Sequence, residues 1–180
     1  VYDDLQAPSI AALPGMQERT IIVDGFSKTY SMTGWRLGFG IMPPALAERV
    51  DLLLTHAIGS TAHFTQYAGV EALTGPQDAV AEMLAEYQRR RQAIVDGLNA
   101  IPGFACQAPQ GAFYAFPNIR GTGKTSDELA NCILEQGGVA LLPGSAFGAN
   151  GEGYLRLSYA NSLENIQEGL RRIRAVVEAL

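Results

Sequence analysis

The sequence predicts an α/β chain in two parts, the edge of a layered α/β structure followed by a compact α+β domain. Two observations support this prediction. Short β-branched apolar runs alternate with longer segments whose apolar residues repeat at helical spacing. The pair Gly75-Pro76 interrupts that pattern, and we place the domain boundary there, between residues 1–75 and residues 76–180.

The first part contains two predicted strands and two predicted helices. Residues 20–24 form a short apolar run that ends in a turn sequence, which predicts a buried strand. A second strand is expected over residues 37–42, and the proline pair that follows it opens a helix, because proline is tolerated in a first helical turn. Another helix is expected over residues 63–73.

The second part begins with a long helix, predicted over residues 77–99. Thr125 and Glu128 have the spacing of a capping box and predict the start of a helix that stops at a glycine pair. Asn161 and Glu164 have the same spacing before a final helix. Strands are expected over residues 104–107, 112–116, 139–142 and 154–158.

Composition and charge exclude several classes of protein. Hydrophobic residues make up 47% and charged residues 17% of the chain, which is ordinary for a folded protein. No apolar run approaches the roughly 18 residues that cross a bilayer, and a net charge of -5 gives no general attraction to nucleic acid or acidic membranes. Cys106 and Cys132 form no C-x-x-C pair, so we expect two core residues in a reducing compartment. His56 and His63 lack zinc-site spacing, and no metal is expected.

Two basic regions and one glycine-rich loop resemble binding sites but are not expected to be functional. Arg89–Arg91 and Arg171–Arg174 lie on helices rich in glutamate, so solvated faces are expected rather than a nucleic-acid surface. Gly121–Thr125 resembles the end of a phosphate-binding loop, but Asn118 stands where that loop requires its first glycine. We expect a flexible loop there that leads to the Thr125 cap.

Lys28 and Arg36 are the candidate residues for covalent chemistry and phosphate binding. Lys28 is one of two lysines, with Lys124, and it closely follows the first predicted strand, where α/β scaffolds hold functional loops. An amine that condenses with a carbonyl and a guanidinium that binds phosphate oxygens together suit an aldehyde-bearing phosphate ligand. The Ser27 hydroxyl is expected to add a hydrogen bond. On these residues alone, a solvated loop lysine and a surface ion-pair arginine stay open as alternatives.

The segment Ser27–Gly38, with the sequence SKTYSMTGWRLG, closely resembles the lysine motif of class I/II aminotransferases, a fold-type-I family that uses pyridoxal phosphate. Further segments resemble that family in the right order, namely Gly111–Tyr114, Val139–Phe147 and Tyr154–Ala160. The resemblance runs from Tyr2 to the C-terminus. It implies that residues 1–75 are the C-terminal part of the large, three-layer cofactor-binding domain and that residues 76–180 are the small α+β C-terminal domain.

The resemblance also implies roles for single residues. Lys28 forms the Schiff base with pyridoxal 5'-phosphate and later acts as general base. Arg36 binds the cofactor phosphate, and Ser27 assists it. Tyr2 resembles the tyrosine that donates a hydrogen bond to the cofactor 3'-oxygen, with a strand-end tyrosine as the structural alternative. The family's aspartate partner of the pyridine nitrogen falls before Val1.

Arg156 is the candidate substrate-binding residue. It interrupts an otherwise apolar strand, and a buried arginine needs an anionic partner. The resemblance implies that this partner is the α-carboxylate of the substrate, which fits the guanidinium fork. A protein carboxylate such as Glu152 is the alternative. Phe113 and Tyr114 lie on adjacent, opposite-facing positions of a strand, and core packing is the expected role of both, with a place of one of them beside the substrate channel as the alternative.

The expected function is a pyridoxal-phosphate-dependent aminotransferase that moves an amino group between an α-amino acid and a 2-oxo acid through the Lys28 Schiff base. The alternatives are a lyase or synthase on the same fold and the ligand-sensing aminotransferase-like domain of a transcription regulator. The resemblance implies a cytoplasmic homodimer with shared active sites, without nucleic-acid or membrane partners. Val1–Asp4 lacks an initiator Met and signal-peptide features, so we expect a piece of a longer protein that alone binds the cofactor weakly or not at all.

Overall fold

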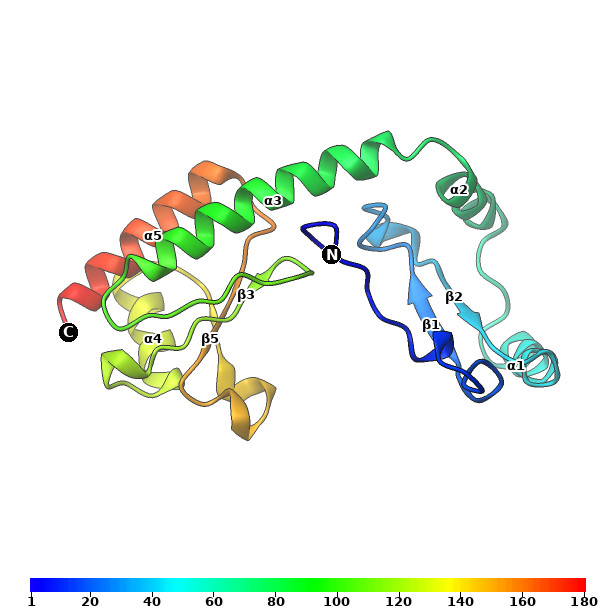
Figure 1. Cartoon of the computed structure of the whole chain (residues 1–180), viewed down its shortest axis with the longest axis horizontal. Coiled ribbons are helices and arrows are strands. Elements are labelled where there is room, and N and C mark those ends of the chain that lie inside the picture. Colours follow the sequence, from blue (N-terminus) through cyan, green and yellow to red (C-terminus); the bar gives the residue numbers. More distant parts are fainter. The chain divides into compact units, whose positions relative to one another are not determined.

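The computed structural model describes residues 1–180 and divides them into two units, each of which combines helices with a small sheet (Figure 1). The larger unit consists of Val1–Leu5 and Met83–Leu180, and the smaller unit is Gln6–Glu82. This content of helices and small sheets confirms the α/β prediction. The predicted domain boundary at residues 75 and 76 concerns the complete protein and stays a prediction.

The smaller unit is built on two antiparallel strands, β1 (Ile22–Gly25) and β2 (Gly38–Ile41). Helices α1 (Pro44–Ala57) and α2 (His63–Thr74) follow them in the chain. The short 3-10 helices of this unit are η1 (Ile10–Ala12), η2 (Gln17–Arg19) and η3 (Thr33–Trp35). The bounds of these strands and helices agree closely with the segments that the hydrophobic patterns predict.

β1 is more exposed than its sequence predicts. Val23 exposes 81% of its surface and Ile21 exposes 52%. Within residues 1–180 this strand is not buried as predicted, because β1 pairs there with the single strand β2, and a two-stranded sheet buries little surface. The buried side chains of the smaller unit are Phe26 and Met32, on the loop after β1, and Thr65 of α2.

The larger unit contains helices α3 (Asp78–Asn99, which starts in the smaller unit), α4 (Ser126–Gly137) and α5 (Leu163–Glu178). Its strands are β3 (Tyr114–Ala115), β4 (Leu142–Pro143) and β5 (Leu155–Ser158). They form an antiparallel sheet in the order β3-β5-β4, so β5 is the central strand. The 3-10 helices are η4 (Arg120–Thr122), η5 (Gly144–Phe147) and η6 (Ala149–Gly151). None of the helices in the chain combines the length and apolar character that crossing a membrane requires.

Some predicted strands are shorter in the structure. Residues 104–107 contribute only an isolated bridge, between Ala105 and Asn118. Of residues 139–142, only Leu142 enters β4. Their apolar side chains are needed in the core, but the backbone turns away from the sheet after one or two paired residues.

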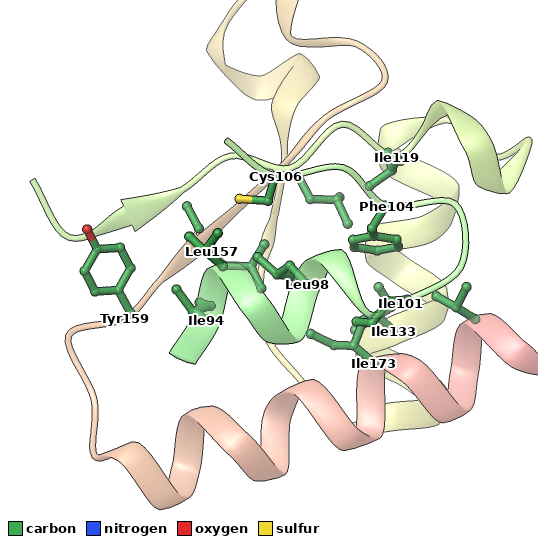
Figure 2. Close-up of a cluster of buried hydrophobic side chains, with 14 of the residues drawn as sticks. Ile94, Leu98, Ile101, Phe104, Cys106, Ile119, Ile133, Leu157, Tyr159 and Ile173 are labelled. Carbon is green, nitrogen blue, oxygen red and sulfur yellow. The ribbon is translucent and has the colours of Figure 1, made fainter. Parts of the chain in front are cut away.

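A single hydrophobic core holds the helices and the sheet of the larger unit together. Figure 2 shows Ile94 and Leu98 of α3, Ile133 of α4, Ile173 of α5 and Leu157 of β5 gathered around one another. All five are buried, and Leu98 and Ile133 expose no surface. Burying a side chain of this size stabilises a fold by about 1.5–3 kcal/mol. The core therefore fixes the central strand β5 from one face.

The predicted capping box at the start of α4 is confirmed. The Thr125 hydroxyl accepts a hydrogen bond from the Glu128 N–H at 3.3 Å, and the Glu128 carboxylate accepts one from the Thr125 N–H at 3.0 Å. The cap of α5 lies one residue later than predicted. The Ser162 hydroxyl accepts from the Asn165 N–H at 3.2 Å, whereas Asn161 accepts from the Ser162 N–H.

Most of the arginines in the two basic regions form ion pairs on exposed helix faces, as predicted: Arg89 and Arg90 with Glu86, Arg171 and Arg172 with Glu168, and Arg174 with Glu178. Arg91 is the exception, because it is 9% exposed and pairs with Asp3 at 2.7 Å. It also donates to the Pro109 carbonyl at 3.1 Å. A solvated position is wrong for Arg91, since each helical residue is rotated by about a quarter turn from the last and Arg91 faces inward.

Candidate active site

Lys28 lies on a turn that directly follows β1. The Phe26 N–H donates to the Leu37 carbonyl at 3.2 Å, which closes the base of the loop between β1 and β2. Within the loop, the Tyr30 N–H donates to the Phe26 carbonyl at 3.2 Å, and the Ser31 N–H donates to the Lys28 carbonyl at 3.3 Å. Lys28 is exposed, so this hydrogen-bonded turn presents its amine at the surface of the unit.

Phe26 anchors the lysine loop to helix α2. It is 4% exposed, and its ring centroid lies 5.6 Å from that of Phe39 and 5.7 Å from that of Tyr30. On α2, Gly69 is buried, and a Cβ there would lie 2.5 Å from Leu37 Cδ2 and 3.4 Å from Phe26 Cζ. The absence of a side chain at Gly69 allows this close approach, so α2 supports the loop that carries Lys28.

Arg36 lies in an open groove of the same unit, with a volume of about 540 Å³, within the roughly 300–1,000 Å³ typical of ligand pockets. Its Nη1 donates to the Thr33 carbonyl at 2.9 Å, and the residue is otherwise exposed. Trp35 and Phe64, whose ring centroids are 6.3 Å apart, line the groove together with Ser31, Thr61 and Thr65. A guanidinium beside hydroxyl side chains is a donor set that suits a phosphate group. The residues present therefore fit the phosphate of the predicted ligand.

Non-glycine residues with left-handed backbone occur next to the predicted site residues. They are Ser31 (φ 54°) and Arg36 (φ 52°) in the lysine loop, and Asp3 (φ 59°), Asp4 (φ 56°) and Ala112 (φ 61°) around Tyr2. Such conformations cost on the order of 1–3 kcal/mol each and persist where the surrounding structure imposes them. Their concentration in these two places supports a functional origin of both loops.

Tyr2 is buried in the larger unit, with 3% of its surface exposed. Its hydroxyl donates to the Ala112 carbonyl and accepts from the Tyr159 hydroxyl at 3.2 Å. Burial raises the pKa of Tyr2, although the hydrogen bond with Tyr159 and the charge of Arg91 oppose the shift. The hydroxyl that was expected to face the cofactor thus has protein partners, and its cofactor role stays a prediction.

Arg156 lies on the central strand β5, on the face away from the core. Its neighbours Leu155 and Leu157 are 0% and 8% exposed and point into the core, so alternation along the strand turns Arg156 to the opposite face. It forms no ion pair within residues 1–180. The alternative partner Glu152 instead accepts a hydrogen bond from the Ser126 N–H at 2.9 Å.

Two aromatic residues lie beside Arg156, and neither was predicted as its neighbour. Phe113 packs against the core as predicted, but Tyr114 is 36% exposed, and its ring centroid lies 4.6 Å from Cζ of Arg156. The ring centroid of Phe147 lies 4.2 Å from the same atom. The signal for Tyr114 was present, because the residue after it is a core alanine and strand alternation puts Tyr114 on the other face. No local signal marks Phe147.

The structure distributes the predicted residues over both units. Ser27, which is half-buried, Lys28 and Arg36 belong to the smaller unit, and Tyr2 and Arg156 belong to the larger one. The smaller unit thus holds the residues that are predicted to bind the cofactor through an amine, a hydroxyl and a guanidinium, and the larger unit holds the arginine that is predicted to bind the substrate carboxylate. A second groove of about 540 Å³, lined by residues of η1, η2 and the strand ends, contains none of them.

Comparison with known proteins agrees with the family resemblance of the sequence. The model of the family described as aminotransferase class I and II matches residues 1–173. The chain is 46% identical over 173 residues to the putative aminotransferase YugH of Bacillus subtilis (strain 168), and the match covers 96% of the chain and 44% of that protein. It is 44% identical over 181 residues to an aspartate aminotransferase of Pyrococcus horikoshii, with 99% of the chain and 46% of the relative covered.

Solved structures agree as well. The chain superposes with a TM-score of 0.94 on an aromatic aminotransferase from Pyrococcus horikoshii OT3, at 45% identity, over 99% of the chain and 48% of that structure. The TM-score is also 0.94 for the aspartate aminotransferase from Rhizobium meliloti, at 39% identity over 99% of the chain and 47% of that structure. The chain thus spans less than half the length of the relatives it matches. On the family match and these identities, it belongs to the class I and II aminotransferases, whose members are pyridoxal-phosphate-dependent enzymes.

Proposed function

We propose that the complete protein is an aminotransferase that moves an amino group between an α-amino acid and a 2-oxo acid. The observation that carries this proposal is the exposed Lys28 on the turn after β1, in the unit that also holds the groove where Arg36 lies beside hydroxyl side chains. When bound, pyridoxal phosphate supplies an aldehyde for the lysine and a ring that withdraws electrons from the substrate Cα.

Each candidate residue has one task in this proposal. Lys28 holds the cofactor through its Nζ and, after the substrate has displaced it, moves the proton at the substrate Cα. Arg36 binds the cofactor phosphate, with the Ser27 hydroxyl as a second donor. Arg156 binds the substrate α-carboxylate. Tyr2 donates to the cofactor 3'-oxygen, which requires its hydroxyl to give up the Ala112 carbonyl.

Borohydride reduction of the complete protein with pyridoxal phosphate tests the central assignment. We expect peptide mapping to find the label on Lys28, and Lys124, the only other lysine of residues 1–180, is the internal control. A Lys28→Ala variant is expected to lose turnover almost entirely, whereas Lys124→Ala keeps it. A label on Lys124, or near-normal turnover of the Lys28 variant, would refute the proposal.

The names of the relatives favour transfer over the other reactions of the same scaffold. Similar proteins are named aspartate aminotransferase and aromatic-amino-acid aminotransferase. We therefore propose a substrate panel that starts with aspartate and the aromatic amino acids. Amino-acid-dependent conversion of the bound cofactor to its amine form would support transfer, and release of ammonia and a 2-oxo acid from a single substrate would indicate a lyase.

We also propose that the complete protein is a cytoplasmic homodimer in which both chains contribute to each site. The support is the family resemblance of the chain as a whole. Sedimentation analysis is expected to give twice the mass of one chain.

A further inference from the structure

We propose that Tyr114 and Phe147 are positioning residues for Arg156, whose guanidinium they hold between their rings so that its edge faces an incoming carboxylate. The inference rests on the proposed role of Arg156 in substrate binding. All three residues belong to the larger unit, so their arrangement is a property of one compact body.

The strand order places the first ring beside the arginine. β5 is the central strand, and β3 pairs with it so that Tyr114 lies opposite Ser158, two residues along from Arg156. Residues two apart on a strand share a face, so Tyr114, Ser158 and Arg156 point the same way. A diagonal neighbour across two strands is within reach of a tyrosine and an arginine. The ring centroid of Tyr114 accordingly lies 4.6 Å from Arg156 Cζ.

The second ring comes from the other side of β5. Leu142 of β4 lies opposite Arg156, and the chain runs from β4 directly into η5, which ends at Phe147. This connection is tightly held, because the Gly144 N–H donates to the Tyr154 carbonyl at 2.8 Å and a Cβ on Gly144 would lie 2.1 Å from the Gly151 carbonyl oxygen. The Phe147 ring centroid lies 4.2 Å from Arg156 Cζ.

Both distances are shorter than the roughly 6 Å limit of cation–π contacts. A guanidinium that stacks on a ring presents its flat face to that ring, whereas a carboxylate binds the N–H groups along its edge. The two interactions are therefore compatible. Arg156 has no carboxylate partner within residues 1–180, and Tyr114 and Phe147 are 36% and 50% exposed, so an anion can reach the edge from solvent.

The physical effect of the two rings is to order the arginine before the substrate arrives. A long side chain that binds loses rotamer freedom, and a partner that has already fixed it lowers this cost of binding. The contact is the same in the ground state and in the transition state, because the carboxylate takes no part in the chemistry. Loss of a ring is therefore expected to raise KM on the order of threefold with kcat unchanged.

The first test measures kinetics of the complete protein with its best amino-acid substrate. The variants are Tyr114→Leu and Phe147→Leu, with Tyr114→Phe and Phe147→Tyr as variants that keep a ring. Phe116→Leu is the matched control, since Phe116 is 41% exposed and contacts the rings of Phe147 and Tyr154 but not Arg156. We expect KM to rise in both Leu variants. The dissociation constant of a substrate analogue, the same carboxylic acid without its amino group, is expected to rise with it. Both constants are expected to stay near the wild-type values in the ring-keeping variants and in the control.

The second test does not depend on activity. Phenylglyoxal modifies exposed arginines, and mass spectrometry gives the rate for Arg156 alone. The rate is expected to rise in Tyr114→Leu and Phe147→Leu and to stay unchanged in Phe116→Leu. Equal rates in all variants, or a fall in kcat that accounts for the whole effect, would overturn the positioning role. Faster modification in a protein that transfers no amino group would instead support the positioning role and refute the proposed function.

Discussion

Ser126→Ala is expected to destabilise the larger unit more than the loss of one hydroxyl suggests. Ser126 is the first residue of α4 and exposes no surface. Its Oγ accepts hydrogen bonds from the Gly153 N–H at 2.8 Å and the Tyr154 N–H at 3.2 Å, on the turn that leads into β5 and thus to Arg156. The variant removes both of these acceptor contacts.

The substitution affects the hydrogen bonding of the two N–H groups differently. The Tyr154 N–H also donates to the Gly151 carbonyl at 3.2 Å and so keeps a partner. The Gly153 N–H has no second acceptor and is left buried and unsatisfied, which costs about 1–3 kcal/mol. With a few tenths more for the weakened Tyr154 contact, the expected loss is about 1.5–3 kcal/mol.

Urea unfolding of the 180-residue chain, monitored by far-ultraviolet circular dichroism, measures the change in the global free energy of unfolding. Hydrogen–deuterium exchange of the peptide that covers β5 measures the change in local stability. A loss of about 1.5–3 kcal/mol corresponds to exchange on the order of 10- to 150-fold faster.

Ser145→Ala is the matched control, because its hydroxyl donates to the Asp127 carboxylate at 2.8 Å from a partly exposed position. Its loss is expected to stay below about 1 kcal/mol. If Ser126→Ala costs no more than Ser145→Ala, the buried Gly153 N–H has found another acceptor and the reasoning fails.

Three further outcomes follow from the same structure. Ala112→Gly is expected to stabilise the larger unit by about 1 kcal/mol, because glycine adopts the φ of 61° without the cost that a Cβ imposes there; a lower urea midpoint would contradict this. Gly69→Ala is expected to loosen the lysine loop, since the new Cβ meets the Leu37 side chain at 2.5 Å, and faster exchange at Phe26 is the readout. Hydrogen bonds from Arg171, which have the largest effect, and from Arg172 lower the pKa of Glu168 from 4.5 to about 2. Because the folded pKa is lowered, this pairing stabilises the chain above about pH 4.5 and is lost as the pH falls toward about 2. Carbon NMR titration of Glu168 in a variant with both arginines replaced by alanine should show its pKa near the ordinary value, and an unchanged pKa would exclude the pairing as the cause.

Signals that lie within a few residues of one another predicted structure well. The Thr125–Glu128 capping box and the apolar repeat of α3 act through contacts inside one helix, so no knowledge of the rest of the chain is needed. The 12-residue motif around Lys28 is also local, and it was sufficient for the family. Its loop appears in the structure where the sequence placed it, directly after β1.

Environments made by distant residues were predicted less well. The apolar run of β1 indicated burial, but Val23 is 81% exposed because the only partner strand is β2. Arg91 sits in a run of three arginines, and only its contact with Asp3, 88 residues earlier, shows that it faces inward. The neighbours of Arg156 likewise come from β3 and η5.

By itself, the sequence determined the family and the order of helices and strands, and it supplied the prediction of which residues bind cofactor and substrate. These depend on short motifs and on periodicity, which the order of residues carries directly. The tertiary structure alone decided that Tyr2 is held by Ala112 and Tyr159, and that Arg156 lies beside two rings without a carboxylate partner. Such contacts join residues far apart along the chain, and only the packing of β5 between its neighbouring strands brings the rings to the arginine.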